Sequence, residues 1–120
     1  MMKYHGLLCI GDPHVASRVP GFRRDDYAQT ILRKLRWIMD YTEQHRLRPL
    51  ILGDLFHWPQ GTSNWMLTEL INLFKGRDVL SVTGNHDTTE RELIANDSLA
   101  VLQAAGVITL LDQTGPVLMN

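Results

Sequence analysis

Apolar and polar residues alternate along this chain in blocks that predict strands and helices in turn. Short apolar runs with the length of buried strands occur at 4–10, 49–52, 78–82 and 107–111. Between them, apolar residues recur every third or fourth position, which predicts helices at about 26–44, 63–75 and 97–105. Asp25 or Asp26 is expected to cap the first helix and Ser63 the second, and residues 115–120 are read as the start of a fifth strand.

The regular alternation of strand and helix indicates an α/β fold with a mostly parallel sheet flanked by helices. The apolar runs are continuous rather than alternating, as is typical of parallel strands that are covered on both faces. With 120 residues, the chain fits one domain at most.

Composition limits the expected partners and the cellular compartment but does not identify a function. The 12 basic and 13 acidic residues nearly cancel, so the net charge provides no long-range attraction to nucleic acid or to an anionic membrane. The single cysteine, Cys9, lies in an apolar run and is expected in the core; one cysteine excludes a disulfide framework within one chain. The N-terminal apolar stretch is too short for a signal peptide and no run approaches a membrane span, so we expect a cytoplasmic protein.

Each of the first three predicted strands is followed by a similar polar motif. The motifs read GDPH at 11–14, GDLFH at 53–57 and GNHD at 84–87. In an open α/β sheet the carboxyl ends of parallel strands lie along one edge, where ligands bind, so the three motifs are expected to converge. They bring together three carboxylates, one amide and three imidazoles, which belong to Asp12, His14, Asp54, His57, Asn85, His86 and Asp87.

This mixture of oxygen and imidazole ligands suits divalent ions of intermediate hardness, and we expect two of them, with Mn²⁺ favoured over Fe or Zn. Two ions about 3.5–4 Å apart, joined by a bridging carboxylate, can activate water and hold a phosphoryl group. Asp54 directly follows a glycine in the middle motif and is the best candidate for the bridge. Asp12 and His14 can both reach one ion, and Asn85 offers a neutral oxygen to the other.

The order and spacing of these motifs resemble the calcineurin-like metallophosphoesterase superfamily, whose pattern begins D-x-H, G-D and G-N-H-[DE]. The resemblance covers essentially the whole chain, but only the N-terminal half of the family's domain. It implies that Asp12 and His14 bind the first ion, that Asp54 bridges and that Asn85 binds the second. It also implies hydrolysis of phosphate esters, with His86 beside the scissile phosphate as general acid or transition-state donor.

The motif GDLFH and the proline after it look most like the Mre11/SbcD nuclease branch of that superfamily. This narrower resemblance implies that His57 handles a DNA phosphate, that DNA phosphodiester bonds are the substrate, and that an SMC-like ATPase is a partner. A homodimer is a further assembly open to the chain. Basic residues after the first motif are expected either to contact substrate phosphate or simply to be solvated, and these are Arg18, Arg23 and Arg24.

The later part of the family's pattern is missing from this sequence. That pattern continues with a separate histidine and G-H-x-H, whereas no histidine follows His86 here. We therefore expect residues 1–120 to be a partial metallophosphoesterase domain, either truncated or completed by another chain. Such a piece should bind metal weakly, show little or no hydrolysis alone, and leave one sheet face without its cover.

Other interpretations stay open at this stage. A phosphomonoesterase or a cyclic-nucleotide phosphodiesterase would use the same ligands. A non-catalytic scaffold could keep the fold for protein binding, although the intact ligand residues argue against it. His57 could be an ordinary loop residue, and Asp87 could only cap the following turn or orient its neighbour.

Overall fold

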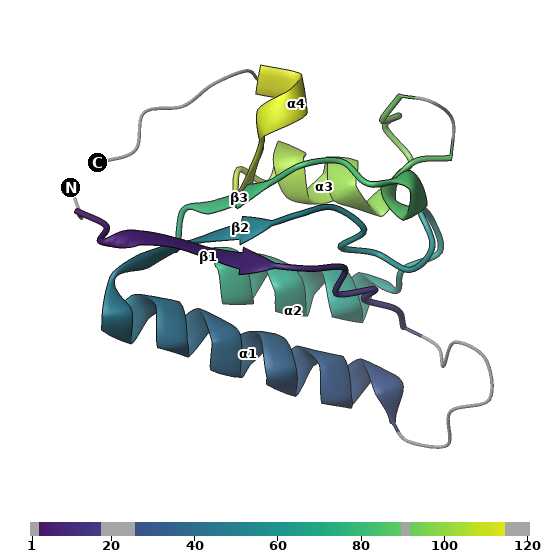
Figure 1. The fold of residues 1–120 in the computed structure, drawn as a ribbon. Coiled ribbons are helices and arrows are strands. Elements are labelled where there is room, and N and C mark those ends of the chain that lie inside the picture. The colour runs from purple at the N-terminus through teal and green to yellow at the C-terminus, as the bar shows by residue number, and fades with distance from the viewer. Residues whose placement is uncertain (1–2, 18–25, 90–91, 115–120) are drawn as a thin grey trace.

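The sheet holds four parallel strands in the order of the sequence, β1-β2-β3-β4 (Figure 1). The computed structural model describes residues 3–17, 26–89 and 92–114. The bounds of the strands are Gly6–Ile10, Leu47–Ile51, Val79–Ser81 and Ile108–Leu110. Helices alternate with these strands, so the predicted α/β fold with a parallel sheet is confirmed.

The three longer helices begin close to the predicted positions. Helices α1, α2 and α3 span Tyr27–His45, Asn64–Phe74 and Ser98–Ala104. The carboxylate of Asp26 caps α1 by accepting a hydrogen bond from the backbone N–H of Gln29. The hydroxyl of Ser63 caps α2 in the same way, by accepting from the backbone N–H of Met66. Both caps confirm the sequence prediction.

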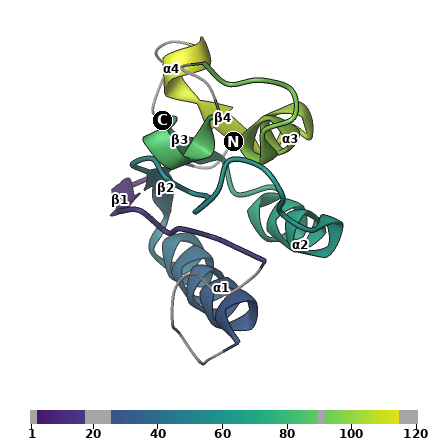
Figure 2. The same ribbon diagram turned by 90° about the vertical axis from the view of Figure 1, so that its right-hand side faces the viewer.

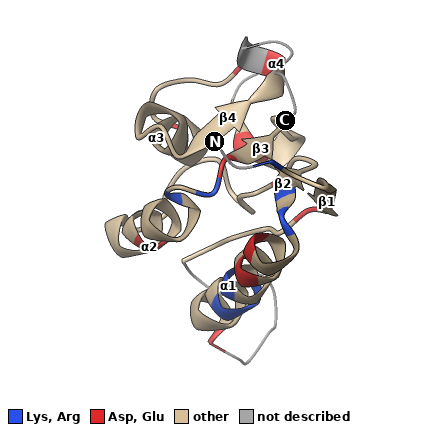
Figure 3. Cartoon of the chain, turned by 90° about the vertical axis from the view of Figure 1, so that its left-hand side faces the viewer, with Lys and Arg blue, Asp and Glu red and all other residues tan. Residues whose placement is uncertain are grey.

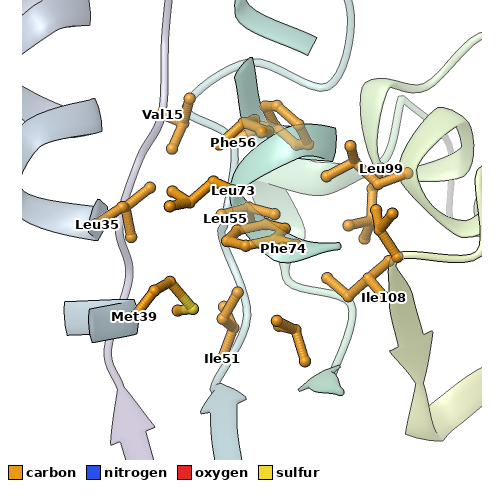
Figure 4. Close-up of a cluster of buried hydrophobic side chains, with 14 of the residues drawn as sticks. Val15, Leu35, Met39, Ile51, Leu55, Phe56, Leu73, Phe74, Leu99 and Ile108 are labelled. Atoms are coloured by element: carbon orange, nitrogen blue, oxygen red, sulfur yellow. The ribbon is translucent and has the colours of Figure 1, made fainter. Parts of the chain in front are cut away.

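All three helices cover the same face of the sheet, as Figures 1 and 2 show. Helix α1 contacts α2, and α2 contacts α3, so the helices form one layer. A crossover between parallel strands is right-handed, and four strands laid down in consecutive order therefore place every helix on one side. The hydrophobic core fills the space between the two layers (Figure 4), and its labelled members are Val15, Leu35, Met39, Ile51, Leu55, Phe56, Leu73, Phe74, Leu99 and Ile108.

The opposite face of the sheet exposes apolar side chains. Leu7 is 45% exposed and Leu52 is 50% exposed, and Cys9 is also exposed. Burial alternates along β1, because successive side chains of a strand point to opposite faces and the helix layer covers one of them. The prediction that Cys9 lies in the core is therefore wrong. The predicted cover on both faces is found for β3, whose three residues are all buried, but not for β1.

Some element boundaries differ from the prediction. Strand β2 begins two residues earlier, and β4 is shorter because the chain turns into the short helix α4 (Leu111–Thr114). In this turn the carboxylate of Asp112 accepts a hydrogen bond from the backbone N–H of Thr83 at 3.1 Å, which holds the turn against the end of β3. The fifth strand expected at 115–120 lies outside the described residues. No helix in the described ranges is long and apolar enough to cross a membrane.

Candidate metal centre

Three loops meet at the carboxyl edge of the sheet, one after each of β1, β2 and β3. The first two run side by side, because the N–H of His14 donates to the carbonyl of Asp54 at 3.0 Å and that of Val15 donates to Leu55 at 2.6 Å. A bond in the other direction runs from the N–H of His57 to the carbonyl of Val15 at 2.9 Å. These contacts extend the pairing of β1 with β2 past the sheet and hold the first two motifs together.

The third loop is joined to the second through two carboxylates. Asp54 Oδ1 accepts a hydrogen bond from the N–H of His86 at 2.7 Å. The carboxylate of Asp87 accepts from the N–H of Phe56 at 2.9 Å and from that of Gly84 at 3.0 Å. Asp87 is fully buried, and this burial raises the pKa of its carboxyl group above the ordinary value, although both hydrogen bonds oppose the shift. Asp87 is therefore a tie between loops, which decides the role that its position in the sequence left open.

The closeness of the second and third loops requires two glycines. A Cβ atom on Gly84 would lie 2.2 Å from both the backbone nitrogen and Oδ1 of Asp54, far inside van der Waals contact. Gly53 has a φ of 113°, and a Cβ there would lie 3.2 Å from the Cα of Gly84. The glycines of the GDLFH and GNHD motifs thus let Asp54 approach the third loop.

Three of the five described residues other than glycine with positive φ are the predicted ligands of the first ion. Asp12, His14 and Asp54 have φ values of 39°, 51° and 51°. Residues with a Cβ rarely adopt this left-handed region, and each such residue costs about 1–3 kcal/mol unless its surroundings hold it there. Hydrogen bonds between the loops supply that constraint at His14 and Asp54, and strain of this kind is typical of functional sites.

Asp12, His14 and Asp54 form a group that can hold a metal ion. Each offers one ligand atom, and all three atoms lie within 4.8 Å of one another. Asp12 is exposed while the other two are half-buried, so the group is open to solvent on one side. Two carboxylates and one imidazole fit a divalent ion of the Mn, Fe or Zn type. The structure thus brings together the residues predicted for the first ion.

Asn85, the predicted ligand of the second ion, lies on the same edge. It is the first residue of the short 3₁₀ helix η1 (Asn85–Asp87), and it is exposed. The next residue, His86, donates its backbone N–H to Asp54, so Asn85 directly precedes a residue that is hydrogen-bonded to the expected bridging carboxylate. Its part in binding a metal ion stays a prediction.

His14, His57 and His86 form a second group of converging side chains. One nitrogen of each lies within 4.8 Å of the others, and the Nδ1 atoms of His14 and His57 are 3.4 Å apart. Desolvation lowers the pKa of His57, and the neighbouring imidazoles of His14 and His86 lower it further, because a proton on one ring repels a proton on the next. The predicted gathering of three imidazoles is confirmed, while the catalytic roles assigned to His57 and His86 stay predictions.

Sequence reasoning did not identify the residues that fix the first loop from outside. The hydroxyl of Tyr27, at the start of α1, donates to the carbonyl of His14 at 2.7 Å. The Ser17 hydroxyl accepts from the backbone N–H of Ser63, at the start of α2. No motif contains Tyr27 or Ser63, and their position at the starts of α1 and α2, beside the carboxyl edge, was the one available signal. The arginines expected to contact phosphate lie outside the described residues, namely Arg18, Arg23 and Arg24.

The comparisons with known proteins agree with this geometry. The family model of the calcineurin-like phosphoesterases matches residues 6–113, which span all three motifs. A search of the curated proteins found no match to this chain.

Proposed function

The chain belongs to the calcineurin-like phosphoesterase family, and from this membership we propose that it is a metal-dependent hydrolase of DNA phosphodiester bonds. The observation that carries the proposal is the convergence of Asp12, His14 and Asp54 within 4.8 Å, with the imidazoles of His57 and His86 beside them. That arrangement supplies ligands for a metal ion and proton-bearing groups for a phosphate at the same edge of the sheet.

In this proposal Asp12 and His14 hold the first of two divalent ions, Asp54 bridges and Asn85 holds the second. Manganese is the proposed metal, because oxygen donors outnumber the one imidazole in this set. When bound, such ions lower the pKa of water and neutralise the charge of a phosphoryl group.

The protein's own groups act on the phosphate. The imidazole of His86 is exposed, while its backbone N–H is fixed by Asp54. The ring is therefore held next to the metal ligands and free to donate a proton or a hydrogen bond to an oxygen of the ester. His57 is half-buried, with its ring against Trp58 at 4.5 Å between centroids, so its orientation is restricted. The His57 ring is therefore suited to holding a phosphate in a fixed position.

The choice of DNA over a monoester rests on His57. The resemblance of the GDLFH motif to the nuclease branch assigns this position to the DNA phosphate, and the location of His57 beside His14 and His86 supports that assignment. We also propose that residues 1–120 turn over slowly by themselves, because Asp54 and Asn85 give the second ion two protein ligands where about four to six donors are usual.

The test compares His57→Gln, His86→Gln and the control His45→Gln with manganese present. His45 is exposed and stacks on Tyr41 within α1, so its loss removes an imidazole without touching the centre. We expect His86→Gln to reduce hydrolysis of both a DNA oligonucleotide and para-nitrophenyl phosphate. His57→Gln should reduce DNA hydrolysis at least about tenfold more than hydrolysis of the activated monoester, because the activated ester depends less on phosphate positioning.

Hydrolysis of the monoester without any DNA hydrolysis would replace the nuclease proposal with a phosphomonoesterase. Equal losses in His57→Gln on both substrates would remove the argument for DNA. Absence of hydrolysis on every ester, also when a protein segment supplying further histidine ligands is fused to the chain, would contradict the enzyme proposal itself.

A further inference from the structure

The three converging imidazoles have a use that the carboxylate centre does not explain. His14, His57 and His86 come from three different loops, yet one nitrogen of each lies within 4.8 Å of the other two. The ring centroids are 5.3 Å apart for His14 and His57, 5.1 Å for His14 and His86, and 5.8 Å for His57 and His86. Three nitrogen donors at this spacing form a ligand set that is chemically distinct from two carboxylates and one imidazole.

The separation of two of these nitrogens matches a tetrahedral ion. Zinc binds imidazole nitrogen at about 2.0–2.1 Å, so two nitrogens on a tetrahedral zinc ion lie about 3.3–3.4 Å apart. The Nδ1 atoms of His14 and His57 are already 3.4 Å apart. His86 is exposed, so a rotation of its side chain can bring the third nitrogen in, and solvent can occupy the fourth position.

The backbone holds all three histidines in place before any ion binds. The N–H of His14 donates to the carbonyl of Asp54, and that of His57 donates to the carbonyl of Val15. The N–H of His86 donates to Asp54 Oδ1 at 2.7 Å. Since the ligands are positioned by the fold, little order has to be created on binding, and this favours affinity.

We propose that His14, His57 and His86 form a zinc-binding site that overlaps the carboxylate centre by sharing His14. Zinc fits either ligand set but prefers imidazole donors, whereas carboxylate and water donors suit manganese, so zinc is expected on the three histidines first. His14 belongs to both sets, and a neutral imidazole offers one lone pair, so zinc on the three histidines competes with an ion held by Asp12, His14 and Asp54. A further consequence rests on the proposed function: zinc in this site withdraws His57 and His86 from the phosphate, and it is therefore an inhibitor of the manganese-loaded enzyme.

The experiment measures zinc binding to the 120-residue chain by calorimetry, with cobalt as a spectroscopic substitute. His57→Gln and His86→Gln each remove one imidazole and leave Asp12, His14 and Asp54 in place. Asp12→Asn removes one carboxylate and leaves the three histidines. His45→Gln is the matched control, because it removes an exposed imidazole from α1.

We expect His57→Gln and His86→Gln each to weaken zinc binding at least about 100-fold, since loss of an outer contact to a metal ligand already costs about 10–100-fold. They should also abolish the intense visible absorption of four-coordinate cobalt. Asp12→Asn and His45→Gln should keep the affinity and the spectrum of the unaltered chain. The opposite pattern, with binding lost in Asp12→Asn and kept in His57→Gln and His86→Gln, would overturn the proposal.

Nuclear magnetic resonance of the unaltered chain gives a second measurement that needs no variant. Zinc should shift the ring nitrogens of three of the five histidines, which are His14, His57 and His86, and leave those of His5 and His45 in place. A shift confined to His14 would overturn the site. If zinc binding follows the proposed pattern while no phosphate ester is hydrolysed, even with a segment supplying further histidine ligands fused to the chain, the zinc site stands and the proposed function falls. If manganese-dependent hydrolysis is found but zinc binding does not depend on the imidazoles, the proposed function stands and the zinc site falls.

Discussion

The two ends of the sheet both carry clusters of polar side chains, but the clusters are composed differently. At the amino end, before β1 and β3, the hydroxyl of Tyr4 donates to the carboxylate of Asp78, and the guanidinium of Arg48 donates to the carbonyl of the same aspartate. Each of these hydrogen-bond donors is therefore paired with an acceptor. At the carboxyl end, the imidazoles of three histidines converge, and two carboxylates converge on one of these imidazoles, so like groups are gathered.

A second cluster at the amino end follows the same rule of complementary pairs. Helix α1 carries both acidic and basic residues (Figure 3). Its Asp40 and Glu43 lie 3.3 Å and 3.2 Å from the guanidinium of Arg77, which also donates to the carbonyl of Met39 at 2.9 Å. This guanidinium fastens α1 to the segment before β3.

The difference between the two ends separates groups that stabilise the fold from groups suited to binding and catalysis. Donors and acceptors that are already paired with one another stabilise the fold and have few free positions for a ligand. Like groups held together by the backbone repel or compete for protons, and a cation between them removes that conflict, which is why such clusters mark functional sites. Substitutions at the carboxyl end should therefore change activity more than stability, and those at the amino end should do the reverse.

The largest effect is expected for His86→Ala at the carboxyl end. In a preparation with measurable phosphoesterase activity, turnover should fall about 10²–10⁴-fold, the usual range for the loss of an acid–base group. The midpoint of urea unfolding should stay nearly unchanged, because the His86 side chain is exposed. Steady-state kinetics and urea titration of the same sample check both halves. Full activity in the variant would remove the proposed role of His86.

Asp54→Asn tests the ligand role instead of the proton-transfer role. The amide keeps an oxygen that can accept from the N–H of His86, but it loses the negative charge that two cations would share. Manganese binding should weaken at least about tenfold with the fold retained, by comparison with losses of about 10–100-fold on removal of an outer contact to a ligand. Elemental analysis after dialysis measures the occupancy. Unchanged occupancy would contradict the bridge.

Asp87→Ala should be the exception that sharpens the comparison, since this carboxylate lies at the carboxyl end but acts as a tie. Its removal leaves the buried N–H of Phe56 and the partly buried N–H of Gly84 without their acceptor. The loss of the buried bond should lower the free energy of unfolding by about 1–3 kcal/mol, and the loss of the partly buried one by less. Urea unfolding measures the loss. Asp87→Asn is the matched control and should lose less, because one acceptor oxygen remains.

Arg77→Ala at the amino end should destabilise the fold by about 1 kcal/mol and leave activity unchanged. Its acidic partners are more than half exposed, so each ion pair contributes little, and the hydrogen bond to Met39 supplies the rest. A double-mutant cycle with Glu43→Ala separates the two terms. A coupling energy well above 1 kcal/mol would show that solvent screens this pair less than its exposure indicates.

The smallest effect concerns Tyr4. Desolvation and the hydrogen bond to Asp78 raise the pKa of the Tyr4 hydroxyl to about 12. Because the folded pKa lies above the unfolded value, the contribution of this group to stability is complete below about pH 10 and falls as the pH rises toward 12. Ultraviolet titration should show that Tyr4 ionises near pH 12. Asp78→Asn should bring it back toward the ordinary range, and an unchanged titration would place the cause elsewhere.

Much of the fold and the composition of the site could be predicted because they depend on local signals. The apolar runs and the helical spacing determine which segments become strands and helices, since each period matches one backbone geometry. A motif placed after a parallel strand must lie at the carboxyl edge, so the convergence of Asp12, His14 and Asp54 followed from chain order alone.

The tertiary structure decided what depends on distances between loops. The sequence leaves the role of Asp87 open, whereas the structure shows a buried carboxylate that accepts from the N–H groups of Phe56 and Gly84. Position 84 requires glycine because Asp54 occupies the space where a Cβ atom would lie. The spacing of residues in the sequence does not reveal this close approach. Cys9 reads as a core residue, but the consecutive order of right-handed crossovers puts every helix on the other face. The sequence thus determined which groups reach the carboxyl edge, and only packing between loops and layers decided which of them face the site, because burial is a property of the neighbours and not of the residue.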